Sequence, residues 1–323
     1  MTTLTIWANA FLTPAGEGLL RESTKPHRLI IAEKLDSVLA IGTTDQRLQE
    51  AEILFGQPDP KEIIQSSRVR WVHLSSAGYT RYDTEEFRSA LQARSAIFTN
   101  SSSVYDEPCA EHLMAFLLTD ARQLYWSYEN QRGARDWPQN PIREHSRLLS
   151  DQTILIVGYG AIGKRLAELL VPYSVKVIGY RRAHQSTGPV PIIGSEQLPS
   201  ALGEADHVIN TLPESSSTRD FFGTQRFGQF KTGARYYSIG RGATTDQDAL
   251  RAALSSGRLA AAYLDVTDPE PLPPDHPLWS LPNCYITPHT GGGHVTEPIR
   301  TVQHFIDNLR RYERGEPLVD RVW

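Results

Sequence analysis

Three side chains with complementary chemistry follow three apolar segments in the second half of the chain. Arg241 comes directly after YYSIG, Glu270 lies in LDVTDPEPLP, and His289 ends CYITPH. A carboxylate beside an imidazole favours the protonated ring, so Glu270 can hold His289 as an effective acid near neutral pH. Arg241 can pair with a carboxylate and polarise a carbonyl oxygen. Together these residue types suit proton transfer to or from an anionic substrate.

A glycine-rich segment upstream, TILIVGYGAIGKRLAELL, has the spacing of a dinucleotide-binding turn. Gly158, Gly160 and Gly163 form G-x-G-x-x-G between a strand pattern and a helix pattern. The first glycine allows a tight turn, the second lets a pyrophosphate approach the backbone, and the third allows close helix packing. Three glycines alone would indicate only a tight turn. The strand before them, and the helix and second strand after them, favour dinucleotide binding.

The segment VIGYRR, at the end of that second strand, predicts which nicotinamide cofactor binds. Arg181 lies 18 residues beyond Gly163, where NAD enzymes carry an acidic residue that binds the ribose 2′-hydroxyl. No acidic residue occurs between Glu168 and Glu196. Arg181 and Arg182 instead offer permanently charged, planar groups suited to a 2′-phosphate. Although both could be solvated surface arginines, we expect NADP(H) to be preferred and NAD(H) to be possible.

Short apolar runs alternate with amphipathic segments, which is typical of βαβ units and parallel sheets. Candidate strands of a first domain are residues 4–7, 29–32, 53–56, 69–74 and 97–100. A second series comprises residues 153–158, 175–180, 207–212, 235–240, 261–266 and 284–288. The sequence therefore predicts an α/β protein with two parallel-sheet domains, of which the second and larger one carries the dinucleotide-binding turn, and a cleft between them.

Two helical patterns connect these domains. Asp106 can cap a helix with Pro108 in its first turn, and the pattern continues through CAEHLMAFLLTDARQL. A second helix pattern, near the C-terminus, carries an apolar stripe and stops at Gly315. We expect this stripe to pack on the first domain. The first domain is then 1–103 plus 294–323, and the NAD(P)-binding domain is 104–293.

Composition excludes several classes of function. With 40% hydrophobic and 22% charged residues and a formal net charge of -4, nothing indicates a surface for nucleic acid. The N-terminus lacks the features of a signal peptide, and no stretch of about 18 apolar residues predicts a membrane span. Cys109 and Cys284, the two cysteines, support neither a disulfide framework nor a metal site. We expect a cytoplasmic protein with no metal, nucleic-acid or membrane partner.

Several motifs follow the order and spacing of one family. They are VGYGAIG, NTLPESSSTRDFFG, SIGRGATTDQDAL, YLDVTDPEPLPPDHPLW and ITPHTGGG. On these motifs the chain resembles the D-isomer-specific 2-hydroxyacid dehydrogenases over nearly its whole length. The resemblance implies two Rossmann-like domains with a cleft between them: a flavodoxin-like substrate domain, residues 1–103 plus 294–323, and a doubly wound, parallel-sheet dinucleotide-binding domain. It also implies an NAD(P)-dependent oxidoreductase that acts on the CH–OH group of 2-hydroxy acids or reduces 2-keto acids. An NADP preference within this family resembles the glyoxylate and hydroxypyruvate reductases.

The resemblance also implies roles for individual residues. Arg241, Glu270 and His289 match the catalytic residues. Asp265 matches the residue that contacts the nicotinamide amide. The substrate-binding residues are Ser76, Ala77, Gly78 and Arg241, the first three through backbone N–H groups that hold the substrate carboxylate. The cofactor-binding residues are Tyr159, Gly160, Ala161, Ile162, Tyr180, Arg181, Arg182, Thr211, Leu212, Pro213, Ile239, Gly240, Asp265 and Gly291.

The segment from 124 to 147 resembles the family's dimerisation arm, which implies a homodimer through the cofactor domain. A peripheral helix and loop is the alternative interpretation of this segment. The substrate loop has Thr80 where several members have Asp, so the particular acid stays open.

Other interpretations stay open as well. Glu270 could belong to a solvated loop, and Arg241, between two glycines, could be a turn residue. The substrate could be a bulkier 2-keto acid, or the protein could be a nucleotide-sensing, non-enzymatic member that resembles the family's corepressors. The other histidines are taken as structural, although His112 stands near the expected cleft. The order of the three candidate residues after a nucleotide-binding pattern favours catalysis.

Overall fold

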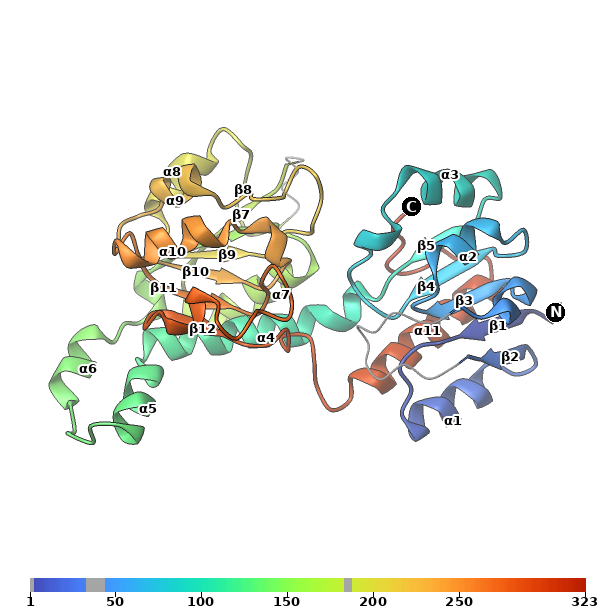
Figure 1. Ribbon diagram of the computed structural model, residues 1–323, viewed down its shortest axis with the longest axis horizontal. Coiled ribbons are helices and arrows are strands. Elements are labelled where there is room, and N and C mark those ends of the chain that lie inside the picture. Colours follow the sequence, from blue (N-terminus) through green and yellow to red (C-terminus); the bar gives the residue numbers. More distant parts are fainter. Residues whose placement is uncertain (1–2, 33–43, 183–187) are drawn as a thin grey trace. The chain divides into compact units, whose positions relative to one another are not determined.

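The computed structural model describes residues 3–32, 44–182 and 188–323, and it divides the chain into two compact units (Figure 1). Unit 1 comprises Met1–Tyr105 and Gly293–Trp323, and unit 2 comprises Asp106–Gly292. The first boundary lies two residues after the expected position and the second lies one residue before it. None of the helices in the described ranges is long and apolar enough to cross a membrane.

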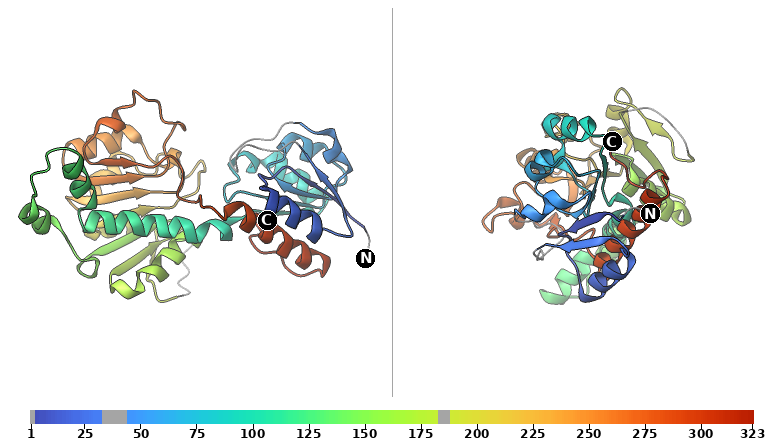
Figure 2. Two further views of the ribbon diagram at one scale, coloured as in Figure 1. Left: turned by 90° about the horizontal axis from the view of Figure 1, so that it is seen from below. Right: turned by 90° about the vertical axis from the view of Figure 1, so that its right-hand side faces the viewer.

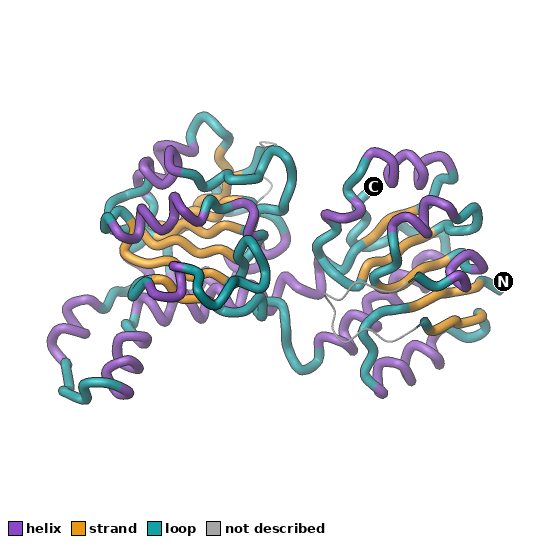
Figure 3. Tube along the Cα trace, in the orientation of Figure 1, coloured by secondary structure: helices purple, strands orange, loops and turns teal. Residues whose placement is uncertain are grey.

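Unit 1 contains a parallel sheet in the order β2-β1-β3-β4-β5. Its strands are β1 (Thr5–Ala8), β2 (Arg28–Ile31), β3 (Ile53–Gly56), β4 (Trp71–Leu74) and β5 (Ile97–Thr99). This is the flavodoxin-like order, in which the connections reverse direction between β1 and β3. Helices cover both faces of the sheet (Figure 3), which explains why the strands are apolar runs rather than alternating patterns.

Two separate cores hold unit 1 together, one on each face of the sheet. On one face, α1 (Pro14–Ser23) and α11 (Glu297–Glu313) pack on β1, β3 and β4 through apolar side chains that include Phe305, which stacks on Phe55. On the other face lie α2 (Pro60–Gln65) and α3 (Glu85–Ala93). The apolar stripe of α11 therefore packs in the core of unit 1, and Gly315, with φ +68°, follows the end of the helix.

Unit 2 contains a larger parallel sheet in the order β12-β11-β10-β9-β6-β7-β8. Its strands are β6 (Thr153–Val157), β7 (Lys176–Tyr180), β8 (Ile192–Ile193), β9 (His207–Asn210), β10 (Ala234–Ser238), β11 (Leu259–Leu264) and β12 (Cys284–Ile286). The direction of winding reverses between β6 and β9, so the expected doubly wound fold is confirmed. Strand β8 was not predicted, because two isoleucines are too short a run to show a strand period.

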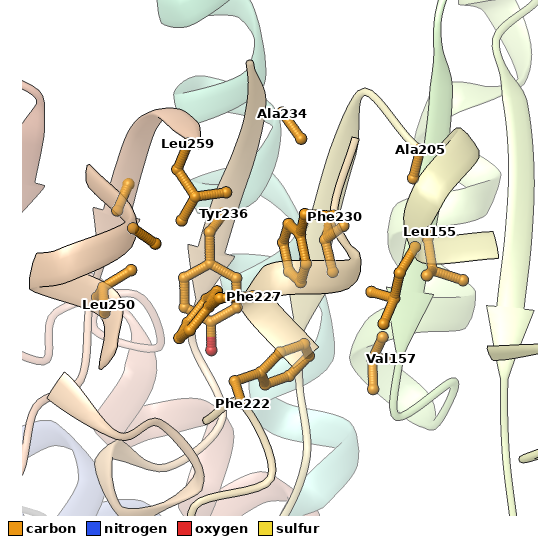
Figure 4. Close-up of a cluster of buried hydrophobic side chains, with 14 of the residues drawn as sticks. Leu155, Val157, Ala205, Phe222, Phe227, Phe230, Ala234, Tyr236, Leu250 and Leu259 are labelled. Atoms are coloured by element: carbon orange, nitrogen blue, oxygen red, sulfur yellow. The ribbon is translucent and has the colours of Figure 1, made fainter. Parts of the chain in front are cut away.

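Helices lie on both faces of this sheet as well (Figure 2). On one face lie α8 (Leu198–Glu204), α9 (Thr224–Gln229) and α10 (Gln247–Ser255). Their core includes the aromatic cluster of Phe222, Phe227, Phe230 and Tyr236 that Figure 4 shows. On the other face, α7 (Ala161–Leu170) packs its glycine, Gly163, against β6, and α4 (Ser102–Ala121) contacts β11 through aromatic side chains. Each fully buried large apolar side chain contributes about 1.5–3 kcal/mol, so this core holds the strand ends in fixed positions.

The start of α4 differs from the prediction. The helix begins at Ser102 rather than after a cap at Asp106, and Pro108 lies inside it. Asn100 Oδ1 accepts from the Ser102 N–H at 3.2 Å, and Asp320 Oδ2 accepts from the Ser103 N–H at 2.8 Å. Because these side chains satisfy the first N–H groups, the helix can begin more than a turn earlier. It continues through the unit boundary into unit 2, where α5 (Leu124–Arg132) and α6 (Gln139–His145) follow.

Candidate active site

The three predicted catalytic residues all lie in unit 2, at one edge of its sheet. Arg241 follows β10, Glu270 follows β11 and His289 follows β12, and these strands are neighbours in the sheet. The carboxyl ends of parallel strands share one edge, which is where open α/β sheets bind ligands. The topology therefore brings an arginine, a carboxylate and an imidazole to the same edge.

Glu270 and His289 form a hydrogen-bonded pair. Glu270 Oε2 lies 2.8 Å from His289 Nδ1, and Glu270 Oε1 accepts from the Thr267 N–H at 3.0 Å. Partial burial by itself raises the pKa of Glu270, but the hydrogen bond and charge of His289, the Thr267 N–H and the Arg241 charge together lower it. The carboxylate is thus ionised at neutral pH and can only accept, so Nδ1 carries the proton and Nε2 is left to exchange one.

The backbone of His289 is left-handed, with φ +52°. This conformation costs about 1–2 kcal/mol for a residue with a Cβ, so the surrounding structure must hold it. The His289 N–H donates to the Asp265 carbonyl at 2.9 Å. The buried Asp265 carboxylate also accepts from the N–H groups of Thr290 and Gly291, each at 2.9 Å. Asp265 thereby fixes the turn that presents the imidazole.

Arg241 is partly buried beside this pair. Burial lowers the pKa of Arg241, while the nearby Glu270 and Glu214 carboxylates and the Cys109 thiol oppose the shift. A guanidinium stays charged throughout the physiological range, so Arg241 remains a cation with reduced hydration. Its Nη1 donates to the Gly240 carbonyl at 2.7 Å. A partly desolvated cation attracts an anionic group more strongly than one in water, which suits the binding of a substrate carboxylate.

The positions on either side of Arg241 require glycine for a steric reason. A Cβ added at Gly240 would overlap the Leu212 carbonyl oxygen, and one added at Gly242 would overlap the Thr267 carbonyl oxygen. The backbone at Arg241 therefore runs in contact with the segments that follow β9 and β11. The motif GRG reflects this close packing of strand ends, and the turn that it forms is part of the candidate site.

The glycine turn lies at the switch point of the sheet and fits a dinucleotide. Gly158 has φ +97°, and an added Cβ would come within 3.0 Å of Thr211. Thr211 Oγ1 donates to the Gly158 carbonyl at 2.7 Å, which joins the glycine turn to the turn after β9. At Gly160 an added Cβ would meet nothing nearer than 3.7 Å, which leaves room beside the backbone. The first N–H groups of α7, at Ala161 and Ile162, lack partners within the helix and suit a pyrophosphate.

The remaining cofactor candidates lie at the same carboxyl edge. Tyr180 ends β7, and its carbonyl accepts from the N–H groups of Gly158 and Tyr159. Leu212 and Pro213 continue the turn after β9, and Ile239 continues from β10. Gly291 lies so close to Ile239 and Asp265 that an added Cβ would approach both side chains within 2.7 Å.

The two arginines after β7 have different surroundings. Arg182 Nη1 donates to Ser217 Oγ at 2.7 Å and so reaches the loop after β9. Arg181 lines a hollow of about 230 Å³ together with Tyr159, Lys164 and Glu168. Both arginines are exposed, and in the part of the chain that the structure describes neither forms an ion pair with a carboxylate.

The predicted substrate loop lies in unit 1, directly after β4. The carbonyls of its residues are engaged: Ser76 accepts from the Ser101 N–H at 3.0 Å, Ala77 from Asn100 Nδ2 at 2.7 Å, and Gly78 from Ser76 Oγ at 2.7 Å. The N–H groups of these loop residues donate to no other residue within 3–32, 44–182 and 188–323. No described residue thus uses the N–H groups of Ser76, Ala77 and Gly78, which suits the binding of an anion.

Sequence reasoning missed several residues that support these sites. Gln57, which is buried, donates to Ser76 Oγ at 2.9 Å and accepts from Arg81 Nη2 at 2.9 Å behind the substrate loop. In unit 2, Asn210 Nδ2 donates to Thr244 Oγ1 at 2.7 Å, which links the segments after β9 and β10. A polar residue that ends an apolar strand was the available signal at Asn210. Gln57 follows β3 in the same way.

A doubly wound sheet with a glycine turn at its switch point, and an arginine beside a carboxylate–imidazole pair, defines the class of nicotinamide-dependent oxidoreductases. Residues 114–291 match the family model "D-isomer specific 2-hydroxyacid dehydrogenase, NAD binding domain". The chain belongs to the D-isomer specific 2-hydroxyacid dehydrogenase family and is an NAD(P)-dependent oxidoreductase. The family predicted from the motifs is confirmed.

Three relatives illustrate the match. An uncharacterized protein from the proB 3′ region of Corynebacterium melassecola is 30% identical over 257 residues, which is 79% of this chain and 82% of that protein. A D-isomer specific 2-hydroxyacid dehydrogenase from Xanthobacter autotrophicus Py2, solved with NADPH and MES, is 25% identical with a TM-score of 0.82, covering 100% of this chain and 98% of that one. An NADPH-dependent glyoxylate/hydroxypyruvate reductase from Sinorhizobium meliloti, solved with NADP and sulfate, has a TM-score of 0.80 at 22% identity, covering 99% and 98% of the two chains, and shows the shared fold.

Proposed function

We propose that this protein reduces a small 2-keto acid of the glyoxylate or hydroxypyruvate type to the D-2-hydroxy acid, with NADPH as the preferred cofactor. The observation that carries this proposal is the 2.8 Å contact between His289 Nδ1 and Glu270 Oε2 beside the partly buried Arg241. A proton donor next to a desolvated cation is what the carbonyl and carboxylate of a 2-keto acid require.

The residues divide the chemistry as follows. NADPH, when bound, supplies a hydride to the carbonyl carbon. His289 gives the proton on Nε2 to the carbonyl oxygen, and Glu270 stabilises the imidazolium before that transfer. Arg241 binds the carboxylate and polarises the carbonyl oxygen. In unit 1, the N–H groups of the loop at Ser76, Ala77 and Gly78 are the proposed donors for an anion. In the oxidation of a hydroxy acid, neutral His289 is the base.

The cofactor is assigned to the carboxyl edge of the sheet in unit 2. The N-terminus of α7, from Tyr159 to Ile162, would hold the pyrophosphate, and the turn at Thr211 would contact a ribose. Asp265 and Gly291 would lie at the nicotinamide end, close to His289. The relative from Xanthobacter autotrophicus binds NADPH, which supports the use of a nicotinamide cofactor in this fold.

The rates of reduction of a panel of 2-keto acids test this function. Initial rates with glyoxylate, hydroxypyruvate, phenylpyruvate and a branched 2-keto acid are measured with NADPH and NADH side by side. The highest kcat/KM is expected for glyoxylate or hydroxypyruvate with NADPH. A higher kcat/KM for the bulkier acids would replace the proposed substrate class. NADPH binding without turnover of any acid would contradict the enzymatic proposal.

Substitution of the arginines after β7 should change the cofactor preference. We expect Arg181→Asp or Arg182→Asp to raise the KM for NADPH about 10- to 100-fold, because a charge-assisted hydrogen bond to the 2′-phosphate contributes about 1.5–3 kcal/mol. The KM values for NADH and for the keto acid should change little. Arg251→Asp, on the exposed surface of α10, is the matched control. If the KM for NADPH is unchanged in both single variants and in the double variant, neither arginine binds the 2′-phosphate.

We also propose that the protein is a homodimer through its cofactor-binding unit. Neither α5 nor α6 contains a buried residue, and Trp137 between them is 86% exposed. Exposed large apolar side chains that gather on one segment are typical of interaction surfaces. Sedimentation equilibrium should therefore give twice the chain mass of 36.2 kDa, and Trp137→Glu should shift the equilibrium toward the monomer. A monomeric wild-type protein at micromolar concentration would rule the dimer out.

A further inference from the structure

A histidine on α4 reaches the turn that carries His289. His112 Nε2 lies 3.1 Å from Thr287 Oγ1 and 3.8 Å from Asp265 Oδ1. The ring packs edge to face on Phe116, one turn further along α4, with 4.5 Å between the ring centroids. All of these residues belong to unit 2. His112 is thus held in one orientation, with Nε2 directed at a hydroxyl two residues before His289.

The protons in this chain of contacts have one consistent assignment. Thr287 Oγ1 donates to Asp265 Oδ1 at 2.6 Å, since a buried carboxylate among hydrogen-bond donors accepts only. The Thr287 oxygen must therefore accept from His112 Nε2–H. Burial lowers the pKa of His112, and the charge of Asp265 opposes that shift without reversing it. His112 is neutral at neutral pH, so it donates a hydrogen bond rather than a proton.

Asp265 connects the hydrogen bonds of His112 and Thr287 to the turn that carries His289. Its Oδ1 accepts from Thr287 Oγ1 and from the Thr290 N–H, and its Oδ2 accepts from the Gly291 N–H. These donors lie on both sides of His289. A rotation of the carboxylate would change the acceptors for the entire turn. The contact from His112 joins this arrangement to α4, 175 residues away in the sequence from Thr287.

We propose that His112 is a positioning residue for the nicotinamide end of the site. Its Nε2–H orients Thr287, Thr287 orients the Asp265 carboxylate, and Asp265 holds the turn from Thr287 to Gly291 with His289 on it. This inference rests on the proposed function for its effect on turnover. Its effect on the turn and on cofactor binding does not depend on which keto acid is the substrate.

Two substitutions separate the hydrogen bond from the bulk of the ring. His112→Phe keeps an aromatic ring against Phe116 but removes the donor, and we expect kcat to fall about 10- to 100-fold because small displacements of reacting groups cost that much. The KM for the keto acid should change less than kcat. His112→Gln restores an N–H donor near the position of Nε2 and should recover most of the lost kcat. Equal loss in both variants would overturn the proposal, because a restored N–H donor would then fail to restore turnover.

A double-mutant cycle tests the route through Thr287. Thr287→Val removes the hydroxyl while it keeps the shape of the side chain. If His112 acts through this hydroxyl, the double variant His112→Phe with Thr287→Val should be no worse than the poorer single variant. Additive losses in kcat would show that His112 acts by another route and would overturn the proposal.

Hydrogen exchange gives a readout that does not require turnover. In His112→Phe the N–H groups of Thr290 and Gly291 should exchange faster than in the wild type, and the Kd for NADPH measured by fluorescence should rise. His112→Gln should exchange like the wild type. His27→Phe in unit 1, which removes a hydrogen bond to Glu313, is the matched control and should leave both measurements unchanged. Unchanged exchange in His112→Phe would overturn the positioning role even if the substrate assignment proved wrong.

Discussion

Replacement of His289 by Asn should lower kcat for keto-acid reduction about 10²- to 10⁴-fold, the contribution expected of a general acid. Asn is the informative substitution because it tolerates the left-handed backbone at φ +52° better than most residues. An amide can still bond to Glu270 but has no proton to exchange near neutral pH. The loss in kcat therefore reports proton transfer rather than a distorted turn.

The controls for this variant follow from the geometry. The Kd for NADPH and the thermal midpoint should stay close to the wild-type values in His289→Asn. His276→Asn is the matched substitution, since the His276 side chain caps the short helix Pro277–Ser280. If His289→Asn retained a kcat within a few fold of the wild type, His289 would not be the proton donor.

The pH dependence of the wild type follows from Glu270. Because the pKa of Glu270 is lowered, its carboxylate is ionised at every pH above the usual glutamate pKa of 4.5. It takes up a proton only as the pH falls below that value. The carboxylate should therefore remain ionised and able to accept from His289 Nδ1 throughout the working range. Glu270→Gln removes this ionised acceptor, so kcat for reduction should fall at every pH at which the wild type is active. An unchanged kcat in Glu270→Gln would show that Glu270 does not support the proton donor.

Replacement of Arg241 by Gln should lower kcat/KM about 10²- to 10³-fold, the cost of removing a group that stabilises developing negative charge. Part of the loss should appear in the KM for the keto acid, because the carboxylate also loses its cation. Arg241→Lys keeps the charge but not the planar guanidinium. We therefore expect its kcat/KM to lie between that of Arg241→Gln and that of the wild type.

The surroundings of Arg241 allow its side chain to be replaced without a change in the backbone. The flanking glycines, rather than the arginine side chain, allow the backbone to approach Leu212 and Thr267. Arg241→Gln should therefore fold normally and bind NADPH with an unchanged Kd. Arg251→Gln on α10 serves as the control. A kcat/KM for Arg241→Gln that equals that of the control would remove Arg241 from the substrate site.

The parts of the fold that local pattern determines could be predicted from the sequence. Buried parallel strands are continuous apolar runs, so the strands from β1 to β7 and from β9 to β12 were expected within a few residues. The glycine turn at Gly158 was expected because its spacing reflects a close backbone approach, and Thr211 is indeed the segment that it approaches. Both features depend on residues that are near one another in the chain.

Features that depend on distant partners could not be predicted. The start of α4 is set by Asp320, which is 217 residues away from Ser103, and no local signal reports that contact. The same limit applies to His112, because an isolated histidine in a helix pattern gives no signal of a partner as distant in the sequence as Thr287, whose Oγ1 lies 3.1 Å from His112 Nε2. Arg181 and Arg182 looked equivalent in the sequence, and only the structure separates the arginine that contacts Ser217 from the one that lines a hollow beside α7.

The left-handed turn at His289 makes folding and chemistry separable in evolution. Asn, Asp and Gly adopt such a backbone at least as readily as His. The Asp265 carboxylate holds the turn by accepting from Thr287 Oγ1 before His289 and from the N–H groups of Thr290 and Gly291 after it. A single substitution at position 289 could therefore silence turnover and leave a stable protein that still binds its dinucleotide. A descendant of this chain could become a sensor of nicotinamide cofactors without first losing its fold.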